Sequence, residues 1–266
     1  MTALLDVDQL SKTFTAGGPP WRRRTVHALS SVSFTLDAGR TLGVVGESGS
    51  GKSTLGRCLL GLSKPDGGSI RFDGAELGSL TRAQLADFRR RVQPVFQDPY
   101  ASLDPRWSVG RSVREALDVF RIGTPLDRER RVHELFDRVG LSPALADRMP
   151  RHLSGGQRQR VGIAAALATD PQLIVADEPV SALDVSVQAQ ILNLFRDLQR
   201  DLGVAAVFIT HDLSVVEHIS HDIAVMHLGR LVEYGRASEV LARPQHPYTQ
   251  TLLAAVPPAT PFPTPH

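Results

Sequence analysis

Apolar and polar residues alternate in short runs through the first 45 positions of the chain, as in LLDVDQL, SVSFTL and TLGVV. An alternation with a period of two is typical of strands that bury one face. Gly-Gly-Pro-Pro at 17–20 interrupts the runs and favours a loop. We therefore expect an N-terminal sheet of short strands.

The spacing of apolar residues becomes helical at 51–62, and SIRFDG and VQPVF predict two further strands. Residues 99–167 are mostly helix-like. The later runs QLIVAD and VAAVFIT are almost continuously apolar, which is typical of central parallel strands covered on both faces. Between them, apolar residues at helical spacing predict a helix that ends at Gly203: Val187, Ile191, Phe195, Leu198 and Leu202. These elements predict an α/β sheet interrupted by a helical insert.

The composition is that of a globular protein, with 266 residues, 42% apolar content, 30 basic and 28 acidic residues. The basic runs WRRR (21–24) and FRRR (88–91) are short and far apart, so we expect solvated surface and no nucleic-acid partner. The single cysteine, Cys58, excludes an internal disulfide and predicts a packed thiol in a reducing compartment. No apolar run is long enough to span a membrane and no signal-peptide pattern is present, so we expect a cytosolic chain. The proline-rich end, PPATPFPTPH, predicts an extended tail.

Residues 46–53, GESGSGKS, match the phosphate-loop pattern G-x-x-x-x-G-K-[ST] between a predicted strand and a predicted helix. The glycines let backbone N–H groups surround phosphate, Lys52 can reach the β- and γ-phosphates, and Ser53 can offer its hydroxyl to Mg²⁺. A plain strand-to-helix turn would not require a lysine at this position. The pattern predicts a nucleotide site.

Two carboxylates end the strand in LIVADEP, residues 173–179. An acid at the end of a central strand is costly to bury without a cation, so we interpret Asp177 as a partner of Mg²⁺. Glu178 could orient water and accept its proton. Because Pro179 follows, we expect the backbone of Glu178 to be extended. A capping or turn role for the pair is the alternative.

Gln97 and His211 each follow a predicted strand, in VFQDP and FITHD. The carboxyl ends of parallel strands line the ligand crevice, so both side chains are expected to face the nucleotide. Gln97 could bridge Mg²⁺ and water, and His211 could donate to the γ-phosphate. Alternatively, Gln97 is a turn residue and Asp212 merely caps the next helix.

A second glycine-rich helix start lies in LSGGQRQR, residues 153–160. Ser154 and Gln157 form a capping-box pattern. The cap does not explain Gly155 and Gly156, since each glycine in a helical turn costs up to about 1 kcal/mol relative to alanine. Because the chain's own phosphates are assigned to 46–53, we interpret this start as facing the nucleotide of another subunit.

Together, GESGSGKS, LSGGQ, LIVADE, SALD and THD, in this order, resemble the ATPase subunit of an ATP-binding cassette (ABC) transporter over nearly the whole chain. In that family two cassettes dimerise head to tail, with each ATP between one phosphate loop and the other subunit's signature motif. The resemblance implies ATP hydrolysis and an α/β P-loop NTPase core with a parallel sheet, an N-terminal antiparallel β subdomain and an inserted helical subdomain. The implied boundaries are 1–98 and 168–240 for the core, 99–167 for the insert and 241–266 for the C-terminal segment and tail.

The resemblance also implies roles for single residues. The nucleotide-binding residues are Phe14, Gly46, Glu47, Ser48, Gly49, Ser50, Gly51, Lys52, Ser53 and Thr54. The signature residues facing the partner's nucleotide are Leu153, Ser154, Gly155, Gly156 and Gln157, and the inter-subunit loop is Ser181, Ala182, Leu183 and Asp184. The catalytic residues are Glu178 as base, His211 as switch histidine and Gln97 as sensor, and Mg²⁺ is held by Ser53, Gln97 and Asp177.

Phe14 stands where family members usually stack a tyrosine on adenine. Phenylalanine keeps the aromatic face and loses only the hydroxyl, so stacking remains the hypothesis. The alternative is that Phe14 belongs to the core of the sheet.

VFQDPYASLDP, ADEPVSALDVSVQAQILNL, THDLSVVEHI and HPYTQTLLAAVP resemble the dipeptide, oligopeptide and nickel importer branch. That branch implies a second ATPase subunit of the same or a related chain, two membrane permease subunits, an extracytoplasmic solute-binding protein and a place at the cytoplasmic face of the membrane. Tyr100, Leu103, Trp107 and Val109 would receive a permease coupling helix, or alternatively form core of the insert.

The chain departs from this branch in lacking the longer cysteine-containing extension of many relatives, so an iron–sulfur cluster is not expected. Peptide import is the predicted function, with import of nickel or another small solute as the alternative. A cassette ATPase of DNA repair or translation would need a long coiled coil, zinc cysteines or a second cassette. A P-loop kinase or GTPase would leave LSGGQ unexplained.

Overall fold

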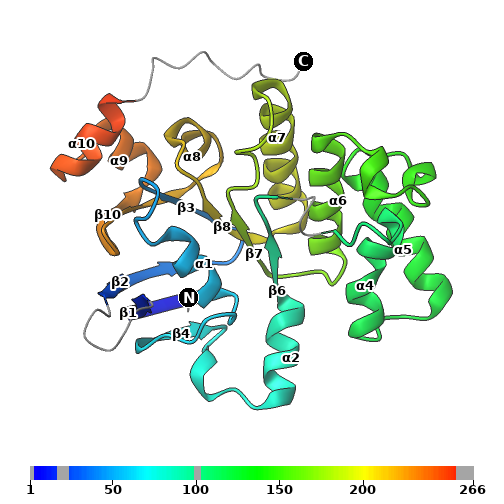
Figure 1. Cartoon of the computed structure of the whole chain (residues 1–266), viewed down its shortest axis with the longest axis horizontal. Coiled ribbons are helices and arrows are strands. Elements are labelled where there is room, and N and C mark those ends of the chain that lie inside the picture. Colours follow the sequence, from blue (N-terminus) through cyan, green and yellow to red (C-terminus); the bar gives the residue numbers. More distant parts are fainter. Residues whose placement is uncertain (1–2, 17–23, 99–102, 256–266) are drawn as a thin grey trace.

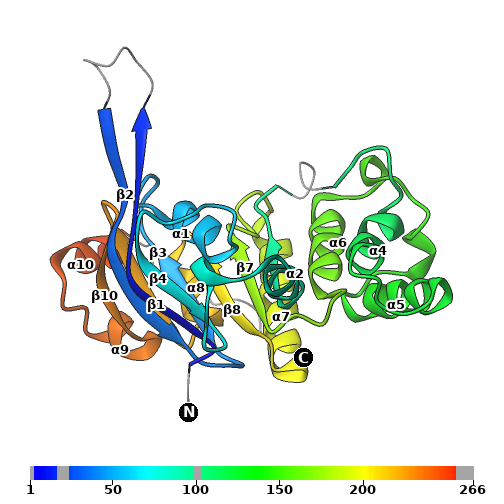
Figure 2. The same cartoon turned by 90° about the horizontal axis from the view of Figure 1, so that it is seen from below.

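The first of two sheets is antiparallel, in a computed structural model that describes residues 3–16, 24–98 and 103–255. Its strands run in the order β2-β1-β4-β5. Their bounds are β1 (Leu5–Ala16), β2 (Arg24–Leu36), β4 (Gly67–Phe72) and β5 (Ala75–Glu76). Figure 2 shows β1 and β2 as a long ribbon whose far end extends beyond the body of the molecule. The antiparallel N-terminal subdomain is therefore present as predicted.

The second sheet has the order β10-β9-β3-β8-β7-β6. Its strands are β3 (Thr41–Val45), β6 (Val92–Val95), β7 (Leu173–Asp177), β8 (Ala205–Ile209), β9 (Asp222–His227) and β10 (Arg230–Arg236). All neighbours in this sheet pair in parallel except β9 and β10. Pro94 lies in β6, the edge strand, where a missing N–H is tolerated. The predicted parallel sheet is confirmed.

The position of β3 differs from the prediction, which grouped TLGVV with the N-terminal sheet. Residues 41–45 instead lie between β8 and β9 in the second sheet. All five residues are buried, so neither face of the strand meets solvent. A strand of this kind is stable only where helices or a second layer cover both faces.

Helices cover both faces of the parallel sheet (Figure 1). They are α1 (Lys52–Leu59), α2 (Arg82–Arg91), α7 (Val185–Leu202), α8 (Leu213–Ile219), α9 (Ala237–Ala242) and α10 (Pro247–Ala254). Alternate residues of β7 belong to different cores. Val175 packs in the cluster with Leu55 of α1, and Ile174 packs in the cluster with Phe195 of α7. Helix α7 ends at Gly203, whose φ of +64° is the left-handed conformation expected there.

The region between β6 and β7 is helical, as predicted. It contains α4 (Val109–Val119), α5 (Pro125–Arg138) and α6 (Gly155–Leu167). Short 3₁₀ turns occur here and after β5, at η2 (Leu77–Ser79), η3 (Pro143–Leu145) and η4 (Pro150–His152). Phe136 of α5 and Val161 of α6 are fully buried in a cluster that continues into β7 and β8, so these helices share a core with the sheet. Within the described ranges, no helix combines the length and the apolarity needed to cross a membrane.

Candidate functional site

The loop 46–51 connects β3 to α1, and its glycines have backbone angles that other residues rarely adopt. Gly46 has φ +150°, Gly49 +81° and Gly51 +104°. A Cβ on Gly46 would lie 2.1 Å from the carbonyl oxygen of Met226 in β9, which no side chain could tolerate. Helix α1 follows without a side-chain cap at Gly51, so its first N–H groups are available to a ligand.

Lys52 folds back over this loop. Its Nζ donates to the carbonyl oxygens of Gly46 at 2.7 Å and Glu47 at 2.9 Å, and only 5% of the residue is exposed. Burial lowers the pKa of Lys52, although the charges of Glu178 and Asp177 oppose this shift. A buried ammonium whose direct partners are neutral carbonyls favours an anion beside it. The loop therefore combines a fixed cation with free backbone donors.

Ser53 and Asp177 meet across the site, where the Ser53 hydroxyl donates to Asp177 Oδ1 at 3.2 Å. Burial raises the pKa of Asp177 above its ordinary value. A hydroxyl and a carboxylate oxygen suit a hard cation such as Mg²⁺, which takes few protein ligands and completes its shell with water and phosphate. In the described part of the chain no three acidic, histidine or cysteine side chains form a metal cage. The donor set present thus fits Mg²⁺ bound together with a phosphate.

Three predicted residues converge at the carboxyl end of the sheet. Glu178 Oε2 lies 3.4 Å from Nε2 of Gln97 and 3.3 Å from Nδ1 of His211. They follow β6, β7 and β8, three adjacent parallel strands, so the strand-end reasoning placed them correctly. The Glu178 side chain is 19% exposed and that of His211 is 58% exposed, so the carboxylate lies inside and the imidazole at the rim.

The backbone of Glu178 is not extended, and the prediction from Pro179 is wrong. Its φ is +48°, in the left-handed region. The proline restricts the right-handed helical region but does not exclude this one. The Glu178 N–H still donates to the carbonyl oxygen of Ile209 in β8, at 2.8 Å, and the Glu178 carbonyl accepts from the Ser181 N–H. The chain therefore turns directly after its last hydrogen bond to β8. Such angles in residues other than glycine are uncommon and concentrate at functional sites.

His211 and Asp212 have separate roles. Asp212 caps α8 by accepting from the Ser214 N–H at 2.8 Å, so the capping interpretation of THD holds for this residue. His211 takes no part in that cap, and its ring faces Glu178. The cap and the proposed switch histidine therefore coexist.

The second glycine start has the predicted capping box. Ser154 Oγ accepts from Gln157 N–H at 3.2 Å, and Gln157 Oε1 accepts from Ser154 N–H at 2.9 Å. A Cβ on Gly156 would lie 2.6 Å from Cγ1 of Val187 in the same chain, whereas Gly155 has only ordinary contacts. The premise that both glycines need an approaching ligand therefore fails for Gly156, because packing on α7 already requires it.

Figures 1 and 2 show α6, which begins with the signature motif, apart from α1. No hydrogen bond or ion pair of the described residues joins the two motifs. The loop 181–184, for which the resemblance implies a place between subunits, lies in this chain between Glu178 and the residues that start α6. Ser181 Oγ donates to the Glu178 carbonyl at 3.1 Å, and Leu183 contacts the position of Gly155. Asp184 then caps α7.

Phe14 is 44% exposed, so the alternative that it belongs to the sheet core is wrong. It pairs with Val26 of β2, two residues before Ala28, whose carbonyl oxygen packs against Gly51 of the loop. The Lys12 ammonium lies 5.5 Å from the centre of the Phe14 ring. An exposed aromatic face is thus held on the strand pair that contacts the phosphate loop.

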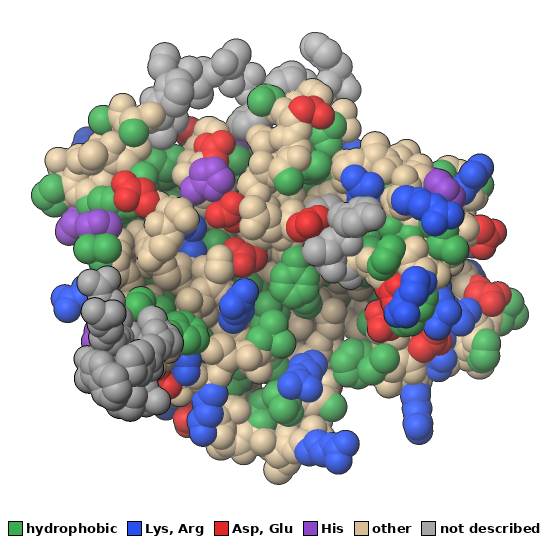
Figure 3. All heavy atoms as spheres, in the orientation of Figure 1, with side chains coloured by type: hydrophobic (Ala, Val, Ile, Leu, Met, Phe, Trp, Pro, Cys, Tyr) green, Lys and Arg blue, Asp and Glu red, His purple; other side chains and the backbone are tan. Residues whose placement is uncertain are grey.

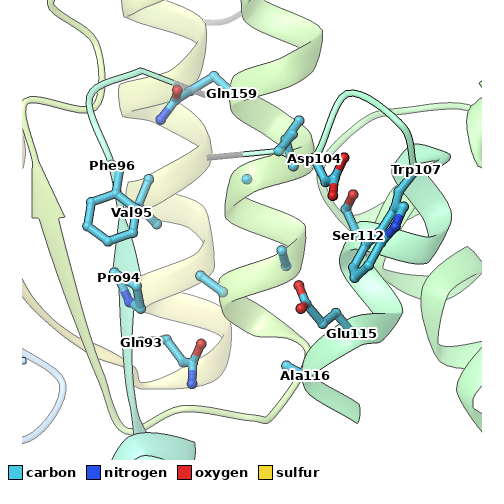
Figure 4. Close-up of a pocket in the computed structure, with 14 residues that line it drawn as sticks. Gln93, Pro94, Val95, Phe96, Asp104, Trp107, Ser112, Glu115, Ala116 and Gln159 are labelled. Carbon is cyan, nitrogen blue, oxygen red and sulfur yellow. The ribbon is translucent and has the colours of Figure 1, made fainter. Parts of the chain in front are cut away.

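Beyond Gln97, a cavity of about 180 Å³ lies between β6, α4 and α6 (Figure 4). Phe96, Trp107, Glu115 and Gln159 are among its lining residues. Leu103 and Val109 are buried, as the alternative of an insert core expects, although Leu103 also lines this cavity. Trp107 lines the cavity, and Tyr100 lies outside the described residues.

The basic run 88–91 is used within the fold. Arg90 and Arg91 pair with Asp87, and the Arg91 guanidinium lies 4.9 Å from the centre of the Phe72 ring. Figure 3 shows Lys and Arg side chains (blue) at several separate places on this face of the molecule. The run is therefore explained by helix and sheet contacts.

One contact to the loop was missed. The Glu47 N–H donates to the hydroxyl of Tyr248, in α10. Tyr248 lies in the stretch HPYTQ, whose local pattern does not indicate which distant element the tyrosine packs against.

Two family models match the chain. The model described as ABC transporter matches residues 29–181, and the model described as Oligopeptide/dipeptide transporter, C-terminal region, matches residues 232–263. Among curated proteins, the probable peptide ABC transporter ATP-binding protein y4tS of Sinorhizobium fredii (strain NBRC 101917 / NGR234) is 51% identical over 96% of this chain and 73% of that protein. The glutathione import ATP-binding protein GsiA of Escherichia coli (strain K12) is 56% identical over 90% of this chain, which spans only 38% of GsiA.

Solved structures of similar architecture include the dimeric post-hydrolysis state of the ATP-binding cassette MJ0796 bound to ADP and Pi. It matches with a TM-score of 0.78 and 30% identity over 88% of this chain and 98% of that chain. The cbiO1 protein of Clostridium perfringens, described as part of the ABC transporter complex cbiONQ, matches with a TM-score of 0.78 and 30% identity over 91% of each chain.

Proposed function

The chain belongs to the ABC transporter family, and we propose that it is the ATP-hydrolysing subunit of an importer for dipeptides or oligopeptides. The observation that carries the hydrolytic role is the convergence of Gln97 and His211 on the Glu178 carboxylate. The peptide class is supported by the match of residues 232–263 to the oligopeptide/dipeptide transporter region and by the similarity to y4tS. Glutathione, named for GsiA, is itself a small peptide and falls within the same class.

In the proposed reaction, the loop binds the phosphates of ATP. The free N–H groups at the start of α1 and the Lys52 ammonium would surround them, and Phe14 would stack on adenine. Mg²⁺ would be held by Ser53, Asp177 and the amide oxygen of Gln97, and when bound it supplies charge that neutralises the phosphates.

Glu178 then accepts a proton from the attacking water, while His211 donates a hydrogen bond to the γ-phosphate. A positioned general base typically contributes about 10²- to 10⁴-fold to the rate. The partly enclosed carboxylate suits this role, because its position is set by Gln97, His211 and the turn at Pro179.

A second cassette, of the same or a related chain, would complete the site. Among the described residues, the signature residues at the start of α6 make no hydrogen bond to their own phosphate loop, which supports a role toward a partner's nucleotide. The chain is also similar to a cassette solved as a dimer with ADP and Pi. The loop 181–184, which contacts the Glu178 carbonyl through Ser181, would transmit changes in the position of Glu178 to the interface between the two cassettes. ATP binding would close the dimer and hydrolysis would reopen it.

The partners in the membrane would be two permease subunits that receive solute from an extracytoplasmic binding protein. The cavity beside Gln97 (Figure 4) is the proposed permease contact, and Trp107 and Phe96 give it an aromatic rim. The chain would then act at the cytoplasmic face of the membrane. Movement of the helical region against the core would reach the permeases there.

The first test is the molar mass in solution of the Glu178→Gln variant, with Mg²⁺ chelated, with and without ATP. A shift from monomer to dimer on ATP addition is expected. A variant that binds ATP and stays monomeric would exclude self-pairing. The substrate class is tested by uptake of a labelled dipeptide and of nickel in cells that lack the chain and in cells that regain it. Restored nickel uptake without peptide uptake would contradict the proposed solute.

A further inference from the structure

A hydrogen bond joins the C-terminal helix to the phosphate loop. The Glu47 N–H donates to the Tyr248 hydroxyl at 3.1 Å, although the residues are 201 positions apart. Glu47 directly follows Gly46, the first glycine of the loop, and Tyr248 lies in the first turn of α10. The entry of the loop is therefore fixed by a segment to which the proposed reaction assigns no role.

The Tyr248 ring is held by His227, with the two rings stacked at 3.9 Å between centroids and 18° between planes. His227 ends β9 and follows Met226, the residue whose carbonyl packs against Gly46. Tyr248 and Gly46 thus rest on consecutive residues of one strand. Strand β9, helix α10 and the loop meet at this place.

The apolar part of Tyr248 continues the core beneath the loop. It packs with the cluster that contains Val45, the last residue of β3, and Val225 of β9. Leu252 of α10 packs against the same cluster. The helix is therefore docked on the strand that leads directly into the loop, and Figures 1 and 2 show α9 and α10 together at the β10 side of the sheet.

The start of α10 has its own anchor in Glu233 of β10. The carboxylate accepts from the N–H groups of Gln245 at 2.8 Å and His246 at 3.0 Å. Burial opposes ionisation, but the Gln245 amide and its neighbours lower the pKa of Glu233 below the usual range. His246 Nδ1 also accepts from the Tyr248 N–H. Because these contacts do not involve the Tyr248 hydroxyl, α10 stays docked without it.

We propose that Tyr248 is a positioning residue for the phosphate loop, and that through it the segment 245–254 sets the affinity of the site for ATP. The inference rests on the proposed function, since it concerns the same nucleotide. A loop with three glycines has backbone freedom that nucleotide binding must remove. The bond to Glu47 removes part of that freedom beforehand. The hydrogen bond stabilises the loop equally in the ATP complex and in the transition state. Its loss therefore raises KM and leaves kcat unchanged.

The experiment compares wild type with Tyr248→Phe, which keeps the ring stacked on His227 and removes only the hydroxyl. Two quantities are measured: hydrogen exchange of the Glu47 amide without nucleotide, and the KM and kcat of ATP hydrolysis. We expect faster exchange at Glu47 and a rise in KM of about three- to tenfold, the range of one neutral hydrogen bond, with kcat unchanged. Glu233→Ala, which releases the start of α10, should raise KM in the same direction.

Tyr234→Phe is the matched control. The Tyr234 hydroxyl donates to the Thr35 carbonyl with a hydrogen-bond length of 2.9 Å, and this bond does not involve the phosphate loop. It should change neither Glu47 exchange nor KM. Unchanged KM in Tyr248→Phe, a fall in kcat instead, or an equal effect in the control would overturn the proposal. A wild-type chain that hydrolyses no ATP would overturn the proposed function, whereas faster Glu47 exchange in Tyr248→Phe would still identify the hydroxyl as the group that holds the loop.

Discussion

Nδ1 of His211 lies 3.3 Å from Oε2 of Glu178, so the residues that follow two adjacent strands, β8 and β7, are in direct contact. The contact gives the carboxylate a fixed orientation at the point where water must be activated. It also places the exposed imidazole between Glu178 and the solvent. The arrangement therefore suits a catalytic base, Glu178, whose position depends on whether a ligand contacts His211.

Glu178→Gln should retain ATP binding and lose at least about 100-fold in turnover, since a general base contributes about 10²- to 10⁴-fold. The amide keeps the shape of the side chain but cannot accept the proton. Steady-state phosphate release and nucleotide binding would be measured together. Glu217→Gln, at an exposed position of α8, is the control and should hydrolyse ATP normally. Hydrolysis at the wild-type rate by Glu178→Gln would show that another group is the base.

Gly156→Ala should destabilise the chain, because the new Cβ would lie 2.6 Å from Cγ1 of Val187. Overpacking of this kind costs about 1–3 kcal/mol. Adding Val187→Ala should relieve the clash and restore most of the melting temperature. We expect ATP hydrolysis to recover together with the melting temperature, because the atoms that the new Cβ would meet all belong to Val187 of the same chain. Hydrolysis that stays low in a double variant of restored stability would mean that Gly156 also serves a partner's nucleotide.

Phe14→Ala should weaken ATP binding by about tenfold, a typical value for loss of an aromatic ring stacked on a base. Phe14→Tyr keeps the aromatic face and should bind normally. Val26→Ala, at the exposed position opposite Phe14, is the matched control. Titration with a fluorescent ATP analogue gives the three affinities. Equal losses in Phe14→Ala and Val26→Ala would indicate damage to the strand pair and would contradict stacking.

His221 should make the chain less stable below neutral pH. Its Nδ1 accepts from the Thr41 N–H at 3.1 Å, which requires the neutral ring, and burial lowers its pKa from the ordinary 6.5. The unfolded chain therefore takes up a proton first. The stabilisation is present above about pH 6.5 and is lost as pH falls through the lower folded-state pKa.

Melting temperatures measured from about pH 8 to about pH 5 would check this expectation. His221→Asn keeps an acceptor and should show a smaller fall over that range. His133→Asn, at an exposed position of α5, should fall as wild type does. An unchanged slope in His221→Asn would assign the pH dependence to other groups.

The sequence predicted most of what depends on local pattern. The alternation of β1 and β2, the apolar runs of β7 and β8 and the helical spacing of α7 each report which faces are buried, and burial follows the period of the element. The phosphate loop could be predicted from its motif for a related reason, because the backbone angles at Gly46 and Gly51 favour glycine over any other residue. Gln97, Glu178 and His211 could be expected together, since each follows the carboxyl end of a strand in one parallel sheet.

Tertiary structure alone decided the features that depend on strand order and side-chain packing. It placed β3 in the middle of the parallel sheet, turned Glu178 into a left-handed conformation and put Val187 against Gly156. It also brought Tyr248 to Glu47 across 201 positions of the chain. A local pattern records how one element is buried, but not which distant element buries it, because that choice is made only when all the strands and helices pack together.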